Sequence, residues 1–174
     1  FSQIFLIFHM QGRLHESYFA TDLLSDILSG GNSSRLYQSL VKERKLFSEV
    51  NAFITGSIDP GLFVVSGKLL QETTMKQAEE ALWYELEKLL NEPVTEFEIQ
   101  KVKNKAEANQ VFSDYGCIAR TMNLAYYELL GDAGMINRQV DSYLCQTSAT
   151  LQNAARSVFS PDKVSVLEYR ATKI

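Results

Sequence analysis

Two segments rich in Val, Phe and Ile, residues 47–58 and 62–70, are separated only by Asp59-Pro60-Gly61. β-branched and aromatic residues are enriched in strands, and Asp-Pro-Gly suits a tight turn between antiparallel strands. The chain is therefore expected to contain a β-hairpin. Residues 1–10 and 164–169 are short apolar segments of the same kind, which predicts two further strands.

Helical periodicity begins before the hairpin. Between residues 15 and 29, apolar residues recur at spacings of three and four, the pattern of one buried helical face: Tyr18, Phe19, Leu23, Leu24, Ile27 and Leu28. Gly30-Gly31 follows and is expected to end this helix, because glycine adopts a left-handed conformation without steric cost. Ser33 or Ser34 is then expected to cap a second helix that runs through Val41.

More helical patterns fill the chain between the hairpin and the final strand. Thr73 or Thr74 is expected to cap the first helix, which Pro93 ends, and Thr95 with Glu98 predicts a capping box for the next. The later helices are expected over residues 96–114, 118–129, 136–145 and 148–158. This order of elements predicts an α+β fold, with one mostly antiparallel sheet and its helices packed on one face.

Length and composition fit one globular domain over residues 1–174, since 45% of the 174 residues are hydrophobic. The net charge is -4, and no cluster of Lys and Arg with interleaved aromatics suggests nucleic acid as a partner. No apolar run approaches the roughly 18–20 residues that a membrane span needs. Because the chain opens on Phe1 inside an apolar run, we expect it to be a fragment of a longer chain.

The sequence offers no complete catalytic or metal-binding set. A helix-type zinc peptidase needs two histidines one turn apart with a glutamate, whereas His9 and His15 are separated by a predicted strand and a turn. The loop at residues 30–34 follows a helix and lacks the glycine and lysine patterns of nucleotide sites. No serine lies in a G-x-S-x-G elbow. We therefore expect no catalytic residue, no metal ligand and no cofactor in this fragment.

The remaining conspicuous side chains have simple structural interpretations. Helical spacing predicts a solvated face made of Glu79, Glu80, Glu85 and Glu87. Four aromatic residues are interpreted as helix-packing residues rather than a ligand-binding box: Trp83, Tyr84, Tyr126 and Tyr127. Cys117 and Cys145 fall in helical patterns and have no CxxC spacing, so neither a zinc ribbon nor a disulfide framework is indicated.

Several motifs together resemble the pitrilysin/insulinase family of zinc metallopeptidases, which includes the mitochondrial processing peptidases. They are Leu-Ser-Gly-Gly-Asn-Ser-Ser-Arg-Leu-Tyr at 28–37, Leu-Val-Lys-Glu-Arg-Lys-Leu-Phe-Ser-Glu-Val at 40–50, Gly-Leu-Phe-Val-Val-Ser-Gly at 61–67, Pro-Val-Thr-Glu-Phe-Glu-Ile at 93–99 and the closing segment 150–166. The resemblance implies one of two α+β domains that form half of a clam-shell around unfolded peptides. The family's zinc motif, His-x-x-Glu-His, is absent here, which implies the second, non-catalytic domain. Zinc is then expected in the N-terminal domain of the parent chain or in its partner.

In some members of this family, an Arg and a Tyr seven residues apart bind substrate and stabilise the reacting carbonyl. Alignment of the neighbouring leucines puts Val41 and Ser48 at these two positions. Val41 cannot donate to an oxyanion, and Ser48 is too short to replace a phenol. The resemblance leaves two readings open: a zinc-bearing chain whose partner supplies the pair, or a degenerate chain that serves as a non-enzymatic scaffold or assembly subunit.

The predicted contacts with substrate or partner lie near the end of the second helix and along exposed strand edges, where an extended peptide can add a strand. The candidate residues are Arg35, Glu43, Arg44, Lys45, Phe47 and Ser48. The expected partners are the N-terminal domain of the same chain, a homologous partner subunit and an unfolded peptide. An unrelated α+β binding domain is a third reading, which a sheet without the expected hairpin and helical face would favour.

Overall fold

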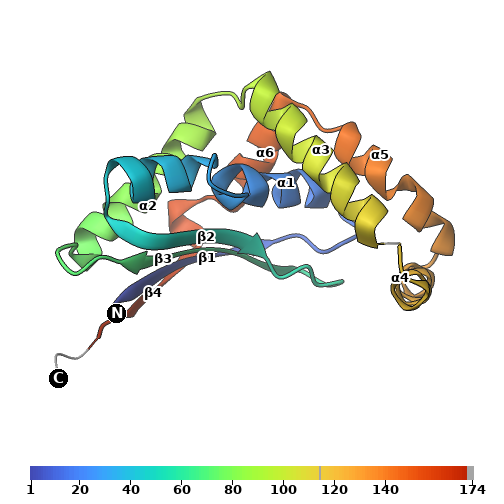
Figure 1. Ribbon diagram of the computed structural model, residues 1–174, viewed down its shortest axis with the longest axis horizontal. Helices are drawn as coiled ribbons and strands as arrows, with labels where there is room; N and C mark the ends of the chain where they lie inside the picture. Colours follow the sequence, from blue (N-terminus) through green and yellow to red (C-terminus); the bar gives the residue numbers. More distant parts are fainter. Residues whose placement is uncertain (114, 172–174) are drawn as a thin grey trace.

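The computed structural model describes residues 1–113 and 115–171. One layer of the domain is a four-stranded sheet in the order β2-β3-β1-β4, in which every pairing is antiparallel. The strands are β1 (Gln3–Met10), β2 (Phe47–Ile54), β3 (Gly61–Leu69) and β4 (Val164–Tyr169). The α+β fold class is confirmed, and the first and last strands of the chain lie side by side in the sheet (Figure 1).

Helices cover one face of this sheet, and none of the described helices lies on the opposite face (Figure 1). The α-helices are α1 (Tyr18–Ser29), α2 (Met75–Asn91), α3 (Glu96–Ser113), α4 (Cys117–Leu129), α5 (Gln139–Leu144) and α6 (Ser148–Val158). Shorter elements are the π-helix η1 (Tyr37–Glu43) and the 3-10 helices η2 (Ala133–Arg138) and η3 (Pro161–Lys163). In Figure 1, α4 lies at one end of the helical layer, beyond the sheet.

Alternation along the strands explains how the two layers pack. In β1, every second residue, including Ile4, Leu6 and Phe8, is buried toward the helices. Phe159, just after α6, lies edge-to-face against Phe8 at 5.2 Å and against Phe63 of β3 at 5.0 Å between ring centroids. Such contacts add roughly 0.5–1.5 kcal/mol per pair beyond area burial. The aromatic cluster therefore ties the last helix to the centre of the sheet.

The predicted hairpin forms, but its connection is longer than a three-residue turn. β2 ends at Ile54 rather than at Ile58, and six residues, 55–60, lead into β3. The Ile58 carbonyl accepts a hydrogen bond of 3.0 Å from the backbone N–H of Arg13, which holds this connection against the segment after β1. Gly12 permits this approach, because a Cβ there would lie 2.4 Å from the Ile58 carbonyl oxygen.

The predicted second helix also differs in detail. After two α-helical residues, 35 and 36, it becomes the π-helix η1, and neither serine caps it as expected. The hydroxyl of Ser34 is buried and finds no hydrogen-bond partner among the described residues, while that of Ser33 lies 2.6 Å from Lys101 Nζ. Glu85 was predicted to face solvent and is instead buried at 3% exposure, because its carboxylate accepts a hydrogen bond of 2.6 Å from Ser39 on η1.

Other helix boundaries follow the sequence closely. Both predicted caps form: Thr74 makes a capping box with Gln77, and Thr95 makes one with Glu98. The predicted helix at 136–145 is a 3-10 helix followed by α5, and Cys145 lies just beyond its end. The last residue of the predicted 96–114 helix lies outside the described residues.

Candidate functional site

The segment between η1 and β2 is fixed by its backbone. Leu46 N–H donates to the Leu40 carbonyl at 3.0 Å, and the Leu46 carbonyl accepts from Leu70 N–H at 3.1 Å and from the Thr73 hydroxyl at 2.9 Å. Lys45 adopts a left-handed conformation with φ 52°. The chain therefore turns sharply from η1 into the edge strand β2.

Most predicted contact residues in this segment face solvent. The exposed ones are Glu43, Arg44, Lys45 and Ser48. Phe47 is 1% exposed and packs against Gly67, where a Cβ would lie 2.4 Å from the Phe47 ring. The Phe47 side chain therefore belongs to the core and is not available to a partner. The Arg44 guanidinium lies 5.6 Å from the ring centroid of Tyr84 on α2.

Arg35 binds within the domain rather than facing a partner. Its Nε and Nη2 donate to the two carboxylate oxygens of Glu98 at 2.7 and 2.9 Å. The same carboxylate accepts from Thr95, so the ion pair and the α3 capping box share one group. The Arg35 hydrogen bond lowers the pKa of Glu98 to about 2, against the opposing effect of burial. Arg35 thus fastens the start of the second helix to the start of α3.

Val41 and Ser48 lie on the two sides of the turn between η1 and β2. Val41 is partly buried and packs against the hydrophobic core. The Ser48 hydroxyl donates to the carbonyl of Lys68 at 3.2 Å. Neither side chain offers a cationic or phenolic donor to a substrate carbonyl, as the sequence indicated.

The free edge of β2 is interrupted by a side chain. The Ser29 hydroxyl at the end of α1 accepts from the Ala52 N–H at 2.7 Å and donates to the Ala52 carbonyl at 2.8 Å. These are the two backbone groups of Ala52 that would bind an added strand, because a residue's N–H and C=O point to the same side of an antiparallel strand. On the other edge of the sheet, β4 pairs with β1 and with no other described strand.

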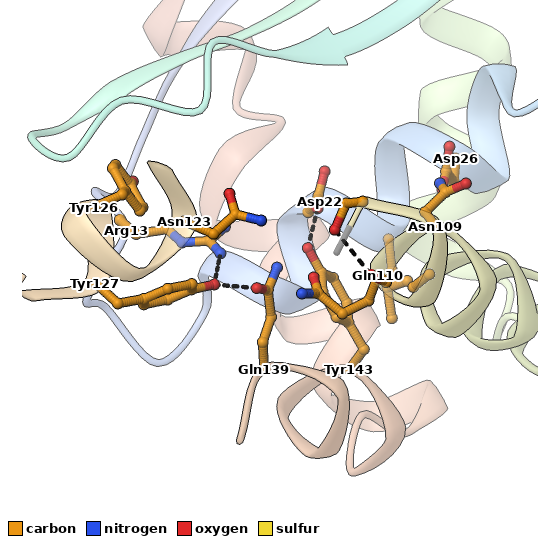
Figure 2. A pocket seen from close by; sticks show the side chains of 13 residues that line it. Arg13, Asp22, Asp26, Asn109, Gln110, Asn123, Tyr126, Tyr127, Gln139 and Tyr143 are labelled. Atoms are coloured by element: carbon orange, nitrogen blue, oxygen red, sulfur yellow. Dashed lines mark hydrogen bonds between the residues drawn. The ribbon is translucent and has the colours of Figure 1, made fainter. Parts of the chain in front are cut away.

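A pocket of about 500 Å³ lies where α1, α3, α4 and α5 approach one another. Figure 2 shows polar side chains of these helices and of the β1–α1 connection gathered around it. Those that carry charge or an ionisable hydroxyl include Arg13, Asp22, Asp26, Tyr127 and Tyr143. A volume of this size is ordinary for a small-molecule site.

Arg13 lies on one side of this pocket. Its guanidinium is 4.6 Å from the ring centroid of Tyr18 and 5.2 Å from that of Phe19, and it donates to the Tyr127 hydroxyl at 3.0 Å. The Tyr127 hydroxyl in turn donates to the side-chain carbonyl of Gln139 (Figure 2). Arg13 remains cationic under all ordinary conditions. Aromatic rings and neutral groups therefore hold a partly buried positive charge.

Asp22 supplies a carboxylate to the same pocket. It accepts a hydrogen bond of 2.5 Å from the Tyr143 hydroxyl (Figure 2). Burial raises the pKa of Asp22, while the Tyr143 hydrogen bond and the positive charge of Arg13 act in the opposite direction. Burial and the nearby Asp22 charge raise the pKa of Tyr143. Of the ion pairs in the described part of the chain, none involves Arg13 or Asp22.

This pocket was not anticipated from the sequence. Tyr127 was interpreted as a packing residue, and it is indeed buried, but its hydroxyl also takes part in the polar network. One signal was available: Asp22 is an acid next to Leu23, inside the pattern that predicted a buried helical face. An acid at such a position needs either a polar partner or a polar cavity.

The two histidines, which the sequence did not indicate as metal ligands, lie apart from any group of possible ligands among the described residues. Within residues 1–113 and 115–171, no three His, Cys, Asp or Glu side chains gather as metal ligands would. His9 is exposed on the sheet, and His15 Nδ1 lies 2.8 Å from the Ser17 hydroxyl at the entry to α1. None of the described helices is long and apolar enough to cross a membrane.

The antiparallel sheet with its one-sided helical layer defines a two-layer α+β domain (Figure 1). A family model described as the Peptidase M16 inactive domain matches residues 1–106. The chain belongs to this family, which confirms the resemblance to the pitrilysin/insulinase peptidases and to their non-catalytic domain. No curated protein sequence matches the chain.

Solved structures share the fold. The inactive peptidase domain of a protein described as a zinc protease from Bordetella parapertussis is 23% identical, with a TM-score of 0.90 over 99% of this chain and 93% of that one. A protease from Helicobacter pylori is 19% identical, with a TM-score of 0.89 over 98% of this chain but only 41% of its own. A chain of complex III from Candida albicans is 14% identical, with a TM-score of 0.78 over 96% of this chain and 42% of that one.

Proposed function

We propose that this chain is the C-terminal domain of a zinc metalloendopeptidase and forms part of the wall of a chamber that encloses unfolded peptides. The observation that carries the proposal is the match of residues 1–106 to the inactive domain of the M16 peptidases. Zinc would be held by the N-terminal domain of the parent chain or by a partner subunit, and this domain would supply structure and contacts.

The surface of α3 and α4 supports docking of another domain. Large apolar side chains there are 65–78% exposed: Val111, Phe112, Ile118, Met122 and Leu129. On α4, residues 118, 122 and 129 lie on one helical stripe, since they are four and seven residues apart. Such a surface is typical of a protein contact, and we assign it to the N-terminal domain or to a homologous partner subunit.

The test uses the full-length parent chain, alone and with its homologous partner. We expect bound zinc, and cleavage of an unfolded peptide that stops when a chelator removes the metal. Replacement of exposed charges in the contact segment, Arg44→Glu with Lys45→Glu, should raise KM for the peptide. The matched control is Lys163→Glu, at an exposed lysine of η3, which should leave KM unchanged. Equal KM values in all three proteins would remove the contact role.

A non-enzymatic scaffold is the alternative. Val41 and Ser48 favour it, because they cannot replace the Arg and Tyr that bind substrate in some relatives. The fold likeness to a chain of complex III is compatible with it as well. If the full-length chain, with and without its partner, binds no zinc and cleaves no unfolded peptide, the scaffold reading replaces the peptidase reading.

A further inference from the structure

The pocket between α1, α3, α4 and α5 holds two opposite charges, on Arg13 and Asp22, that do not form an ion pair with each other. The guanidinium of Arg13 is placed by rings and by Tyr127, and the carboxylate of Asp22 is held by Tyr143. Neither group takes part in an ion pair with any described residue. Within the described part of the chain, each charge therefore has neutral partners but no opposite charge in direct contact, and a charge-assisted hydrogen bond is stronger than one between neutral groups. The cavity between these two side chains is where complementary charges could be supplied.

The third charged residue of the pocket lining, Asp26, already has an ion-pair partner. Its carboxylate receives Lys105 Nζ at 2.7 Å. This contrast distinguishes Asp22 from its neighbour one helical turn away. A ligand with only a positive charge could pair with Asp22 alone, and one with only a negative charge could pair with Arg13 alone.

Neutral polar groups complete the lining. Amide side chains of α3, α4 and α5 reach the pocket from Asn109, Asn123 and Gln139. Amides can donate and accept at the same time, which suits a peptide group or the polar atoms of an amino-acid side chain. Leu23 and Ala106 add a small apolar surface.

We propose that this pocket binds a small zwitterion of the amino-acid class, a free amino acid or a dipeptide, with its carboxylate at Arg13 and its ammonium group at Asp22. The volume of about 500 Å³ accommodates either ligand. The proposal is independent of whether the parent chain cleaves peptides, because it rests on this domain's own side chains. It adds a ligand site on the helical side of the domain, away from the contact segment at residues 43–48.

The test measures binding of alanyl-leucine and of free leucine to the full-length protein by isothermal titration calorimetry. Two blocked ligands test the two charged contacts separately. N-acetyl-alanyl-leucine lacks the ammonium group that would bind Asp22, and alanyl-leucine amide lacks the carboxylate that would bind Arg13. We expect each blocked ligand to bind at least about tenfold more weakly than the free dipeptide, a difference of about 1.4 kcal/mol. Free leucine and the dipeptide distinguish the two ligand lengths.

Variants locate the site. Asp22→Asn keeps the shape and an acceptor for Tyr143, and it should weaken binding of alanyl-leucine at least about tenfold without changing that of its N-acetyl form. Asp162→Asn is the matched control, at an exposed aspartate of η3 that does not line the pocket, and it should leave the affinity within about twofold. The proposal is overturned if neither free ligand binds, if the blocked ligands bind as well as the free dipeptide, or if both variants lose affinity equally. The ligand comparison needs no variant, so a poorly folded Asp22→Asn protein would not prevent a decision.

Discussion

The domain contains two arginine–carboxylate arrangements of similar composition and opposite character. Arg35 and Glu98 meet directly through two hydrogen bonds, and this contact lowers the pKa of Glu98. Arg13 and Asp22 line one pocket without forming an ion pair, and burial raises the pKa of Asp22. The first arrangement fastens two elements together. The second leaves both charges available, which is the state expected of a binding site rather than of a structural joint.

The largest effect on stability is expected from removal of the Glu98 carboxylate, which binds Arg35. Glu98→Ala removes the partner of Arg35 and half of the α3 capping box. Loss of a charged hydrogen bond together with a cap should lower the free energy of unfolding by about 2–3 kcal/mol. Urea denaturation followed by circular dichroism measures it. A loss below about 0.5 kcal/mol would mean that this ion pair is an ordinary surface pair.

A double-mutant cycle tests whether the two arrangements really differ. Arg35→Gln combined with Glu98→Gln should show a coupling energy of about 1–2 kcal/mol, because the two side chains are in contact. Arg13→Gln combined with Asp22→Asn should show at most about 0.5 kcal/mol. Similar coupling energies in the two cycles would contradict the contrast drawn from the structure.

Glu98 and Asp22 should contribute to the pH dependence of stability with opposite signs. Glu98 has a folded pKa of about 2, below its ordinary 4.5, so its contribution is present above about pH 4.5 and is lost as the pH falls toward 2. Allowing for partial exposure, we expect about 1 kcal/mol. The pKa of Asp22 is raised, so its protonation at low pH favours the folded state.

Unfolding free energies of the wild type and of Glu98→Gln across this acidic range measure the Glu98 contribution. The variant should lose less stability on acidification than the wild type. If the two curves run parallel, the Arg35 contact does not influence the titration of Glu98.

The smallest effect is expected at Asp22 in the absence of ligand. Asp22→Asn removes a mostly buried charge that lacks an ion pair, so it should raise the free energy of unfolding at neutral pH by about 0.5–1 kcal/mol. Asp26→Asn breaks an ion pair with Lys105 instead and should lower it by up to about 1 kcal/mol. Thermal unfolding of the two variants side by side measures both signs. Destabilisation by Asp22→Asn would place Asp22 among the structural acids.

Sequence patterns predicted most helices and strands well, because the formation of a helix or strand depends largely on residues close together in the chain. The capping box at Thr95 and Glu98 and the buried face of α1 are both encoded within a few residues. The burial of Glu85 was missed because one of its two partners, Ser39, is 46 positions away, whereas Lys88 is only three. Ser39 lies on a π-helix, and residue spacing in the sequence does not reveal a π-helix.

The pocket was missed for the same reason on a larger scale. Tyr143 and Asp22 are 121 positions apart, and Tyr127 and Arg13 are 114 apart. Such pairs are fixed by the packing of helices, which periodicity within one helix does not specify. The residues predicted to contact a substrate or partner differ in their exposure. Lys45 is exposed, whereas Phe47 is in the core and Arg35 is bound to Glu98.

The bond between Ser29 and Ala52 bears on how this sheet behaves among other proteins. An unprotected edge strand is a template for aggregation, and natural sheets block such edges. Here a single hydroxyl occupies both ladder positions of one residue in the middle of β2. A foreign strand is therefore hindered from pairing with β2. The two edges of the sheet thus differ, and further strand pairing is favoured at β4, the other edge strand.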